Sequence, residues 1–413
     1  MNLTRRTFLL GHDLRSFKQM CSLVLGVSLT VLMLGACQPT TKIQTDVSTL
    51  DVNKLEKPTD SGVFSTHSQT YGQLADGKSI DMVTLHHPKG MEVDVISYGG
   101  IITRLTTPDR QGVFADVVLG LDNLEDYVNL NPYFGALIGR YGNRIANGKF
   151  TLNNVSYQLD ANAWQNHLHG GKQGFDKKVW LMAPFTTEKS AGIVLTLQSP
   201  DGDQGYPGQL DIEVTYELTT DMQLDMRFKA NTNKTTIVNM TQHTYFNLAA
   251  AGDVLDHKMQ INSQAITPVD QRMIPTGDIM PIKDTAFDFT QAKTIGKDID
   301  ANHPQLKFSK GYDHNYVIKA SASDELVLAA IVTEPTSGRL LEVWSEEPAI
   351  QFYTGNGLNG SLQGKGRTYG SRSGFCLEPQ HTPDSPNLPL FPSTTLEPEQ
   401  TYQTRIIYQF YAL

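Results

Sequence analysis

The sequence contains few cysteines, no excess of positive charge and no long apolar run, and each absence excludes a class of protein. Three cysteines among 413 residues exclude a disulfide framework and any zinc or iron–sulfur site built from several cysteines. Lys and Arg number 34 against 43 Asp and Glu, a net charge of −9, so the chain lacks the basic face that neutralises nucleic-acid phosphates. Hydrophobic residues make up 39% of the chain, which predicts an ordered globular body without a nucleic-acid partner.

The N-terminal segment is typical of an export signal. Four basic residues between positions 5 and 18 precede an apolar core at residues 23–34. This core is shorter than the roughly 20 residues of a transmembrane helix, and it suits a signal peptide. It ends in Leu34-Gly35-Ala36-Cys37, which resembles the lipobox of bacterial lipoproteins, where cleavage precedes the cysteine and the thiol is lipidated.

We therefore predict a signal peptide over residues 1–36, a lipidated Cys37, a flexible tether over residues 37–63 and one folded domain over residues 64–413. The tether prediction rests on a segment without aromatic residues or apolar periodicity. The protein is then an exported bacterial lipoprotein, held at the membrane only by its N-terminal lipid and facing the periplasm. A plain signal peptide, a misassigned start codon and a twin-arginine signal at Arg5-Arg6 are the alternatives.

The folded part is predicted to be all-β. Apolar and polar residues alternate with a period of two, as in half-buried strands, over residues 80–85, 92–98, 193–197, 209–216, 223–228 and 402–411. Four dipeptides suit tight hairpins because Gly, Asn and Asp tolerate turn conformations: Asp76-Gly77, Asn147-Gly148, Asn153-Asn154 and Asp201-Gly202. One short helix is expected at residues 122–130. Because no linker divides the chain after residue 65, we expect one large antiparallel β-sandwich.

Six clusters combine polar or titratable residues with aromatic residues and glycines. They occupy residues 139–145, 166–171, 241–248, 311–316, 350–356 and 375–380. Such mixtures suit the wall of a sugar site, because aromatic faces contact C–H surfaces while polar groups satisfy hydroxyls. The clusters therefore predict a binding site for a neutral, hydroxylated ligand.

Each titratable residue in these clusters also has a structural interpretation. Arg144 could form an ion pair, His243 could be held by a backbone carbonyl, and Asp313 could stabilise a turn. Glu378 lies in an apolar strand, where a carboxylate is costly unless it is paired, and this favours a functional role. No single cluster decides between the two interpretations.

The clusters taken together, in this order, resemble the aldose 1-epimerase family, also called galactose mutarotases. A further landmark of the family, residues 201–208, is also present. The resemblance covers nearly all of residues 65–413 and implies a β-sandwich of the galactose mutarotase type, an aldose substrate, no cofactor, no metal and a monomer or homodimer. It departs from the family in Gln242-His243-Thr244, where Asn-His-Ser is the expected sequence, and in the export signal.

The resemblance also implies a role for individual residues. It makes Glu378 the general base and His243 the general acid. It makes Asn143, Arg144, His169, Tyr245 and Asp313 substrate-binding residues, and it adds Gln351 to this set as a supporting amide.

The chemistry of anomer exchange agrees with this pair. One base must take the proton of the C1 hydroxyl while one acid protonates the ring oxygen, and we expect the two on opposite sides of the sugar. We also expect Asp313 to raise the pKa of a neighbouring histidine, so that the alkaline limb of the pH profile belongs to His243.

Four other functions remain open from the residues alone. His167, His169, His243 and Glu378 could bind a metal in a cupin-like enzyme. The same pocket could belong to a non-catalytic sugar-binding surface lipoprotein, or Asp313 and Glu378 could serve a glycosidase. A hexose-6-phosphate epimerase is disfavoured, since no additional Lys or Arg accompanies the clusters.

Overall fold

The structure is a computed structural model, and it describes residues 62–318 and 325–413. The predicted signal peptide, the lipidated Cys37 and the tether up to residue 61 lie outside the described residues. Within the two described ranges, no helix is long and apolar enough to cross a bilayer.

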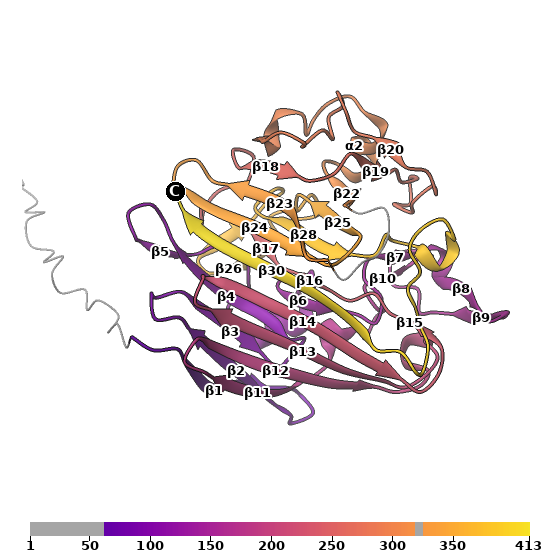
Figure 1. The fold of residues 1–413 in the computed structure, drawn as a ribbon, viewed down its shortest axis with the longest axis horizontal. Coiled ribbons are helices and arrows are strands. Elements are labelled where there is room, and N and C mark those ends of the chain that lie inside the picture. The colour runs from indigo at the N-terminus through magenta and orange to yellow at the C-terminus, as the bar shows by residue number, and fades with distance from the viewer. Residues whose placement is uncertain (1–61, 319–324) are drawn as a thin grey trace, which may run out of the picture. The chain divides into compact units, whose positions relative to one another are not determined.

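One layer of the domain is a nine-stranded sheet in which every neighbouring pair is antiparallel (Figure 1). In spatial order it contains β11 (Leu181–Thr186), β12 (Ser190–Ser199), β13 (Leu210–Thr219), β14 (Gln223–Thr232), β30 (Tyr402–Ala412), β24 (Arg339–Ser345), β23 (Val327–Thr333), β18 (Lys258–Ile261) and β21 (Lys293–Thr294). In β13 the buried Leu210, Ile212 and Val214 alternate with the exposed Asp211 and Glu213, as the period of two predicts. One face of this sheet therefore packs inward and the other is polar.

The facing layer consists of two smaller antiparallel sheets. The five-stranded sheet is formed by β1 (Ser65–Gln73), β2 (Ser79–His86), β3 (Glu92–Ile96), β4 (Ile101–Pro108) and β5 (Phe114–Asp116). The six-stranded sheet contains β17 (Tyr245–Phe246), β28 (Phe375–Gln380), β25 (Ala349–Tyr353), β22 (Asp313–Val317), β19 (Ala265–Thr267) and β20 (Met280–Pro281). A bridge between Val118 and Phe246 joins the two sheets.

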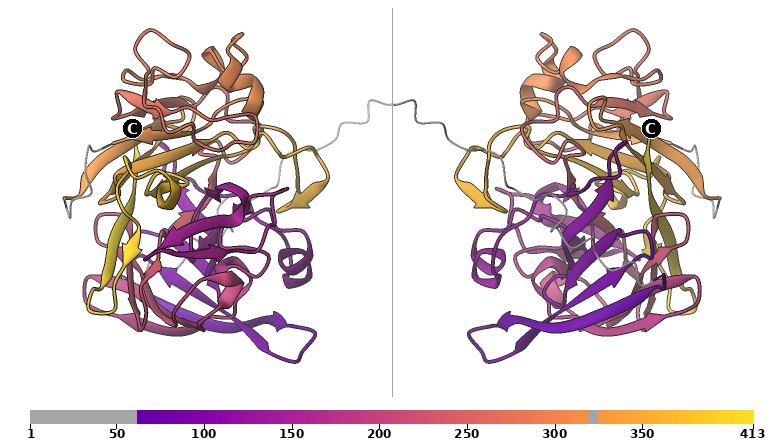
Figure 2. Two further views of the ribbon diagram at one scale, coloured as in Figure 1. Left: turned by 90° about the vertical axis from the view of Figure 1, so that its right-hand side faces the viewer. Right: turned by 90° about the vertical axis from the view of Figure 1, so that its left-hand side faces the viewer.

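One large hydrophobic cluster connects the layers. Buried Val93 of the five-stranded sheet, Val214 of the nine-stranded sheet and Leu377 of the six-stranded sheet belong to one continuous hydrophobic cluster. Figure 2 shows the five-stranded sheet in indigo and purple at the bottom, and the orange segments around β18 and β22 at the top. The architecture is the predicted β-sandwich.

Short elements complete the domain. The helices are α1 (Leu124–Asn129), which confirms the helix predicted at residues 122–130, and α2 (Pro304–Ser309). Five two-stranded pairs are β6 (Ala136–Ile138) with β16 (Thr241–His243), β7 (Arg144–Ile145) with β10 (His167–Leu168), β8 (Lys149–Leu152) with β9 (Val155–Gln158), β15 (Thr236–Ile237) with β29 (Thr395–Leu396), and β26 (Leu362–Gly364) with β27 (Arg367–Tyr369).

The predicted hairpin turns have a mixed outcome. Asn153 and Asn154 form the two-residue turn between β8 and β9 with φ of 50° and 62°, and Asp76-Gly77 lies in the longer turn between β1 and β2. The other two predictions of tight hairpins are wrong. Asn147-Gly148 lies in a 3-10 turn after β7, and Asp201-Gly202 opens a long loop because the Asp201 carboxylate accepts a hydrogen bond from the Gly208 N–H at 2.5 Å.

Candidate active site

A cavity of about 200 Å³ lies where the ends of β7, β10, β16, β22 and β28 meet. Seven of the eight predicted site residues line it: Asn143, Arg144, His169, His243, Tyr245, Asp313 and Glu378. Pro132, Tyr133, Leu168 and Tyr353 complete the wall. Residues that are up to 246 positions apart in sequence, from Pro132 to Glu378, therefore converge on one cavity.

The register of the six-stranded sheet aligns the acidic side of the cavity. Gln351 of β25 is paired with Glu378 of β28, and Asp313 of β22 is paired with Tyr353 of β25. Residues two apart in a strand point to the same face, so Asp313, Gln351 and Glu378 share one face of the sheet. This row brings the two carboxylates and the amide together.

His243 enters the cavity from the short strand β16. It is paired with Ala136 of β6, and its neighbour Gln242 fixes the local backbone. The Gln242 side chain donates to the Gly135 carbonyl at 2.7 Å and accepts from both the N–H and the hydroxyl of Thr244, at 2.8 Å and 2.6 Å. Gln242 and Thr244 are the two residues that differ from the family pattern around His243. Their hydrogen bonds form a local network that holds His243 in place.

His243 and Glu378 form a buried pair. Their Nε2 and Oε2 atoms are 3.6 Å apart, and the side chains are 5% and 2% exposed. Among the described residues, Glu378 Oε2 has no hydrogen-bond partner. A sugar ring does not fit between groups at this distance, so the expectation of acid and base on opposite sides of the sugar is wrong.

Burial controls the protonation of this pair. It lowers the pKa of His243 to about 4 and raises the pKa of Glu378 well above its usual value, with the charge of Asp313 adding to the effect. The expectation that Asp313 raises the pKa of His243 is therefore wrong, because desolvation of the imidazolium outweighs any neighbouring charge. The free site favours a protonated carboxyl beside a neutral imidazole.

Asp313 has a different environment. The Gln351 Nε2 atom donates to its Oδ1 at 2.6 Å, and burial raises the pKa of Asp313 against the opposing effects of Arg144 and this hydrogen bond. Gln351 itself is not among the described residues that line the cavity. Its hydrogen bond orients Asp313, which is compatible with the supporting amide that the resemblance implies for Gln351.

The loop geometry fixes the tautomer of His169. The backbone N–H of Asn143 donates to His169 Nδ1 at 3.1 Å, and the His169 N–H donates back to the Asn143 carbonyl at 3.0 Å. Both residues have positive φ, 58° and 50°, and Gly170 is required because a Cβ there would lie 1.7 Å from the Gly139 carbonyl oxygen. Since Nδ1 accepts, Nε2 of neutral His169 carries the hydrogen and can donate to a ligand.

This tautomer argues against the metal-enzyme alternative. One ligand atom from each of His169, His243 and Glu378 lies within 4.8 Å of the others, but a protonated ring nitrogen has no lone pair for a metal ion. His167 points elsewhere. Its Nδ1 lies 2.6 Å from the Asp160 carbonyl, and its Nε2 lies 2.6 Å from the Tyr206 hydroxyl.

His167 belongs to a second polar group, the Tyr206 cluster, which consists of Arg140, His167, Ser199 and Tyr206. The Arg140 guanidinium lies over the Tyr206 ring, 5.5 Å from its centroid. Its two terminal nitrogens donate to the carbonyls of Ser199, Pro200, Pro207 and Gly208 and to the Ser199 hydroxyl. Arg140 thus holds the loop at residues 201–208, which explains why that landmark accompanies the site without lining it.

Four residues of the cavity wall were not predicted individually: Pro132, Tyr133, Leu168 and Tyr353, of which Leu168 and Tyr353 lie within the predicted clusters at residues 166–171 and 350–356. Tyr133 has φ of 72°, an uncommon conformation for a bulky residue, and its ring contacts those of His169 and His243 with centroids 4.7 Å and 5.8 Å apart. Tyr353 contacts Tyr245 at 5.9 Å. The only signal for Tyr133 was an aromatic pair between Pro132 and Gly135, which by itself resembles a turn.

Comparisons with known proteins agree with this geometry. The sequence profile of a family described as Aldose 1-epimerase matches residues 81–409. Galactose mutarotase of Rattus norvegicus is 43% identical over 352 residues, which cover 84% of this chain and 99% of the relative. Aldose 1-epimerase of Escherichia coli (strain K12) is 36% identical over 348 residues, with coverages of 84% and 99%. The crystal structure of galactose 1-epimerase from Lactobacillus acidophilus NCFM matches with a TM-score of 0.75 at 29% identity, over 84% of this chain and 99% of that one.

Proposed function

The chain belongs to the aldose 1-epimerase family, and we propose that this isomerase interconverts the α and β anomers of neutral aldoses such as glucose and galactose at the cavity that holds His243 and Glu378. The observation that carries the proposal is the buried contact of 3.6 Å between these two side chains. The C1 hydroxyl oxygen and the ring oxygen of an aldose are bonded to the same carbon. An acid and a base that reach neighbouring atoms must therefore themselves be neighbours.

The reaction divides into two proton transfers. The Glu378 carboxylate takes the proton of the C1 hydroxyl, the electron pair of that O–H bond forms the C1 carbonyl, and the bond from C1 to the ring oxygen breaks. The electron pair of the broken bond takes a proton from His243, which gives the open-chain aldehyde. After rotation about the C1–C2 bond, the ring closes on the other face of the carbonyl with the roles of the two residues exchanged.

The protonation state of the free site is compatible with this sequence. A protonated Glu378 with a neutral His243 holds the same single proton as a Glu378 carboxylate with a protonated His243. The first arrangement is the one left after ring opening, and the second is the one that opens the ring. One proton transfer within the pair interconverts them, so they titrate as a unit.

The remaining cavity residues support a neutral sugar. His169 Nε2 and the Arg144 guanidinium supply donors, Asp313 supplies an acceptor, and Tyr133 and Tyr245 supply apolar ring faces. Of the described residues that line the cavity, Arg144 is the only Lys or Arg, against the two carboxyl groups. This charge balance favours an uncharged aldose over a sugar phosphate.

Polarimetry tests the proposal. Freshly dissolved α-glucose and α-galactose should lose their excess optical rotation faster with the enzyme than without it, at a rate proportional to enzyme concentration. Treatment with a chelator should leave that rate unchanged. A rate equal to that of the spontaneous reaction would favour a non-catalytic sugar-binding protein, and a rate abolished by the chelator would favour the metal enzyme.

We also propose that the mature chain is a lipoprotein that begins at a diacylated Cys37. The support is the Leu34-Gly35-Ala36-Cys37 motif behind a short apolar core. Mass spectrometry of the N-terminal peptide from membrane-extracted protein should find the lipid on Cys37. An unmodified peptide that spans Ala36 and Cys37 would contradict processing at this site.

A further inference from the structure

We propose that one end of the domain, which we call the N-terminal edge, rests on the lipid bilayer that holds the anchor. The N-terminal edge comprises residues 62–64, the turns at residues 87–91 and 109–113, and the C-terminal residues 411–413. The inference rests on the proposed lipid anchor at Cys37, and it adds the surface through which the domain itself contacts lipid.

The topology gathers these segments at one end of the five-stranded sheet. β1 begins beside the end of β2, since Ser65 is paired with His86. The turn from β2 to β3 and the turn from β4 to β5 follow at the same end, because the strands are antiparallel and in sequence order. The start of the described chain and both turns therefore form one row.

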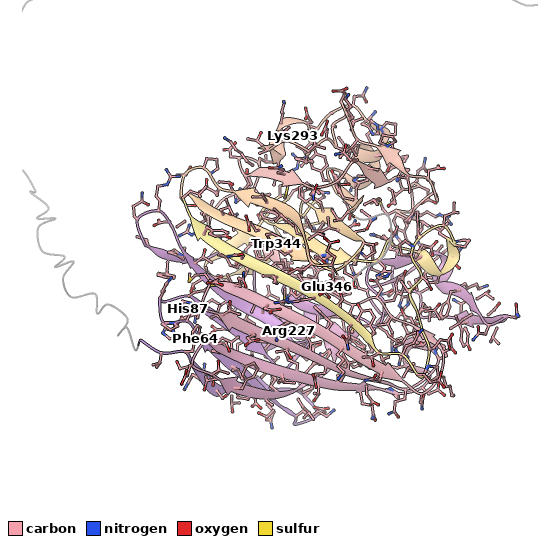
Figure 3. The ribbon with its side chains drawn as sticks, in the orientation of Figure 1. Phe64, His87, Arg227, Lys293, Trp344 and Glu346 are labelled. Atoms are coloured by element: carbon pink, nitrogen blue, oxygen red, sulfur yellow. The ribbon has the colours of Figure 1, made fainter. Side chains whose placement is uncertain are left out.

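The nine-stranded sheet contributes its own end to the same row. The Arg339 guanidinium at the start of β24 donates to the Val113 carbonyl, and the Leu413 N–H after β30 donates to the Gly338 carbonyl, at 3.0 Å and 2.9 Å. His87 Nε2 lies 3.3 Å from the Thr220 carbonyl in the turn between β13 and β14. Figure 3 shows Phe64 and His87 next to each other at this end, where their rings are 5.0 Å apart.

Large apolar side chains are exposed along this row. Val63, Val113 and Leu413 are 59%, 60% and 64% exposed, and Phe114 is 36% exposed. The Phe114 ring lies against Gly90 of the neighbouring turn, where a Cβ would come within 3.1 Å of it. Apolar groups from three separate segments thus share one end of the domain, and exposed apolar surface of this kind marks an interaction site.

Charge and chain length favour a lipid bilayer as the occupant. The charged side chains of this edge and of the adjoining turns from β11 to β12 and from β13 to β14 balance: Lys89, Arg110 and Lys189 against Asp109, Glu188 and Asp221. Such a surface suits insertion of apolar side chains among lipids more than attraction to anionic headgroups. Residues 38–61 connect Cys37 to this edge and span at most about 85 Å when fully extended, so the domain is always near the bilayer and weak contacts suffice.

The placement also leaves the cavity away from the bilayer. The Leu137 N–H donates to the Gly99 carbonyl in the turn from β3 to β4 at 3.0 Å, and Leu137 lies in β6, which is paired with the strand of His243. That turn is at the far end of the five-stranded sheet, about 25 Å from the N-terminal edge along the eight residues of β4. In Figure 1 the β5 hairpin and the cavity strands β7 and β10 accordingly lie on opposite sides.

The test uses the full chain, purified with its lipid and reconstituted into phosphatidylcholine vesicles. Val113→Cys carries an environment-sensitive fluorophore, and Leu390→Cys is the matched control. Leu390 is 89% exposed in the segment after Asp384, whose N–H donates to the Arg144 carbonyl beside the cavity. The remaining thiol, Cys376, is buried and does not compete for the label.

The label at position 113 should shift its emission to the blue in vesicles and lose most of its quenching by an aqueous quencher, relative to the same protein in detergent. The label at position 390 should change little, and addition of salt should not reverse the effect at 113.

Equal quenching of both labels in vesicles would overturn the proposal while leaving the lipid anchor intact. Protection at 113 that depends on protein concentration without lipid would instead assign this edge to a second copy of the chain, which also overturns it. Failure of the anchor itself would appear separately, as protein that does not sediment with membranes, and failure of the isomerase assignment would appear only in polarimetry.

Discussion

The cavity and the Tyr206 cluster receive the same residue types from the same two segments, yet their environments differ. Residues 139–145 send Arg140 to the cluster and Arg144 to the cavity, and residues 166–171 send His167 to the cluster and His169 to the cavity. Both nitrogens of His167 have partners at 2.6 Å. In the cavity, Glu378 Oε2 is buried without a hydrogen-bond partner among the described residues.

This difference separates structure from chemistry. A buried polar group is stable when its hydrogen bonds are made, and one left unmade costs about 1–3 kcal/mol. The Tyr206 cluster makes most of its bonds within the chain, with Arg140 Nε the one cluster nitrogen left without a partner among the described residues, so it stabilises the fold. The cavity contains a polar group without a hydrogen-bond partner among the described residues, Glu378 Oε2, and a ligand can supply that partner. This is the expected property of a binding site.

The largest effect should come from Glu378→Gln. The amide keeps the shape of the side chain but accepts no proton, so turnover should fall about 10²- to 10⁴-fold. The midpoint of thermal unfolding should not fall, because the variant removes a buried carboxyl whose ionisation is already unfavourable. Polarimetry and a melting curve on the same preparation measure both. Near-normal turnover in this variant would remove Glu378 from the base role.

The pH profile sharpens the comparison further. The pair holds one proton between the lowered pKa of His243, about 4, and the raised pKa of Glu378. Below about pH 4, His243 is protonated while Glu378 is still protonated, so the pair holds two protons and activity should decline. At alkaline pH, Glu378 loses its proton, so the pair holds none and activity should decline again. This assigns the acid limb to His243 and the alkaline limb to Glu378, the reverse of the expectation from ordinary pKa values.

His243→Asn should lower turnover by about 10²-fold and remove the acid limb near pH 4. The measurement is kcat/KM across pH, with a folding control at each acidic point. An acid limb that persists unchanged in this variant would show that another group titrates there.

A further prediction concerns the Tyr206 cluster. Arg140→Met leaves the carbonyls of Ser199, Pro207 and Gly208 without their donor, which should cost about 3 kcal/mol of unfolding free energy. Arg227→Met is the matched control. Its side chain is 48% exposed, and Asp225 keeps its second partner Arg405, so the loss should stay below about 1 kcal/mol.

Urea unfolding measures both arginine variants, and polarimetry at a temperature where each is folded measures their turnover. The turnover should remain near the wild-type value in both. A large loss of turnover in folded Arg140→Met protein would mean that the cluster also controls the cavity.

The sequence predicted most of the fold and most of the cavity wall. Alternation specified strands such as β13 and β30, because a half-buried strand needs a period of two. The sequence could not show that Arg140 and His167 belong to the Tyr206 cluster while Arg144 and His169 line the cavity. The two arginines lie on one short segment, and the two histidines lie on another. That distinction depends on contacts with residues 199–208, which are distant in sequence.

The protonation of the site was also beyond sequence reasoning. The pKa of His243 depends on complete burial, and His243 is buried because β16 is enclosed between β6 and β28. Tyr133 was missed for a related reason, because its position over two imidazoles follows from a backbone with positive φ. Local sequence specifies the side chain but not the conformation that directs it.

The smallest effect, and the most specific one, should come from His167→Gln. Near neutral pH the variant should lose about 1 kcal/mol of unfolding free energy, since glutamine cannot reproduce both hydrogen bonds to Asp160 and Tyr206.

Burial lowers the pKa of His167 from 6.5 to about 4, so the unfolded chain binds a proton here that the folded chain does not. The stability that wild-type His167 contributes is therefore present above pH 6.5 and is lost as the pH falls toward 4, by up to about 3 kcal/mol. The variant lacks this loss, so the stability difference should shrink on acidification and then change sign, while the other buried histidines titrate equally in both proteins. Urea unfolding at several pH values measures the crossover, and KM for galactose should stay unchanged. His169→Asn provides the contrast within the same segment: it should raise KM about tenfold, because it removes the hydrogen bond that we propose His169 donates to the sugar. A stability difference that is constant with pH, or a raised KM in His167→Gln, would contradict the separation of the Tyr206 cluster from the cavity.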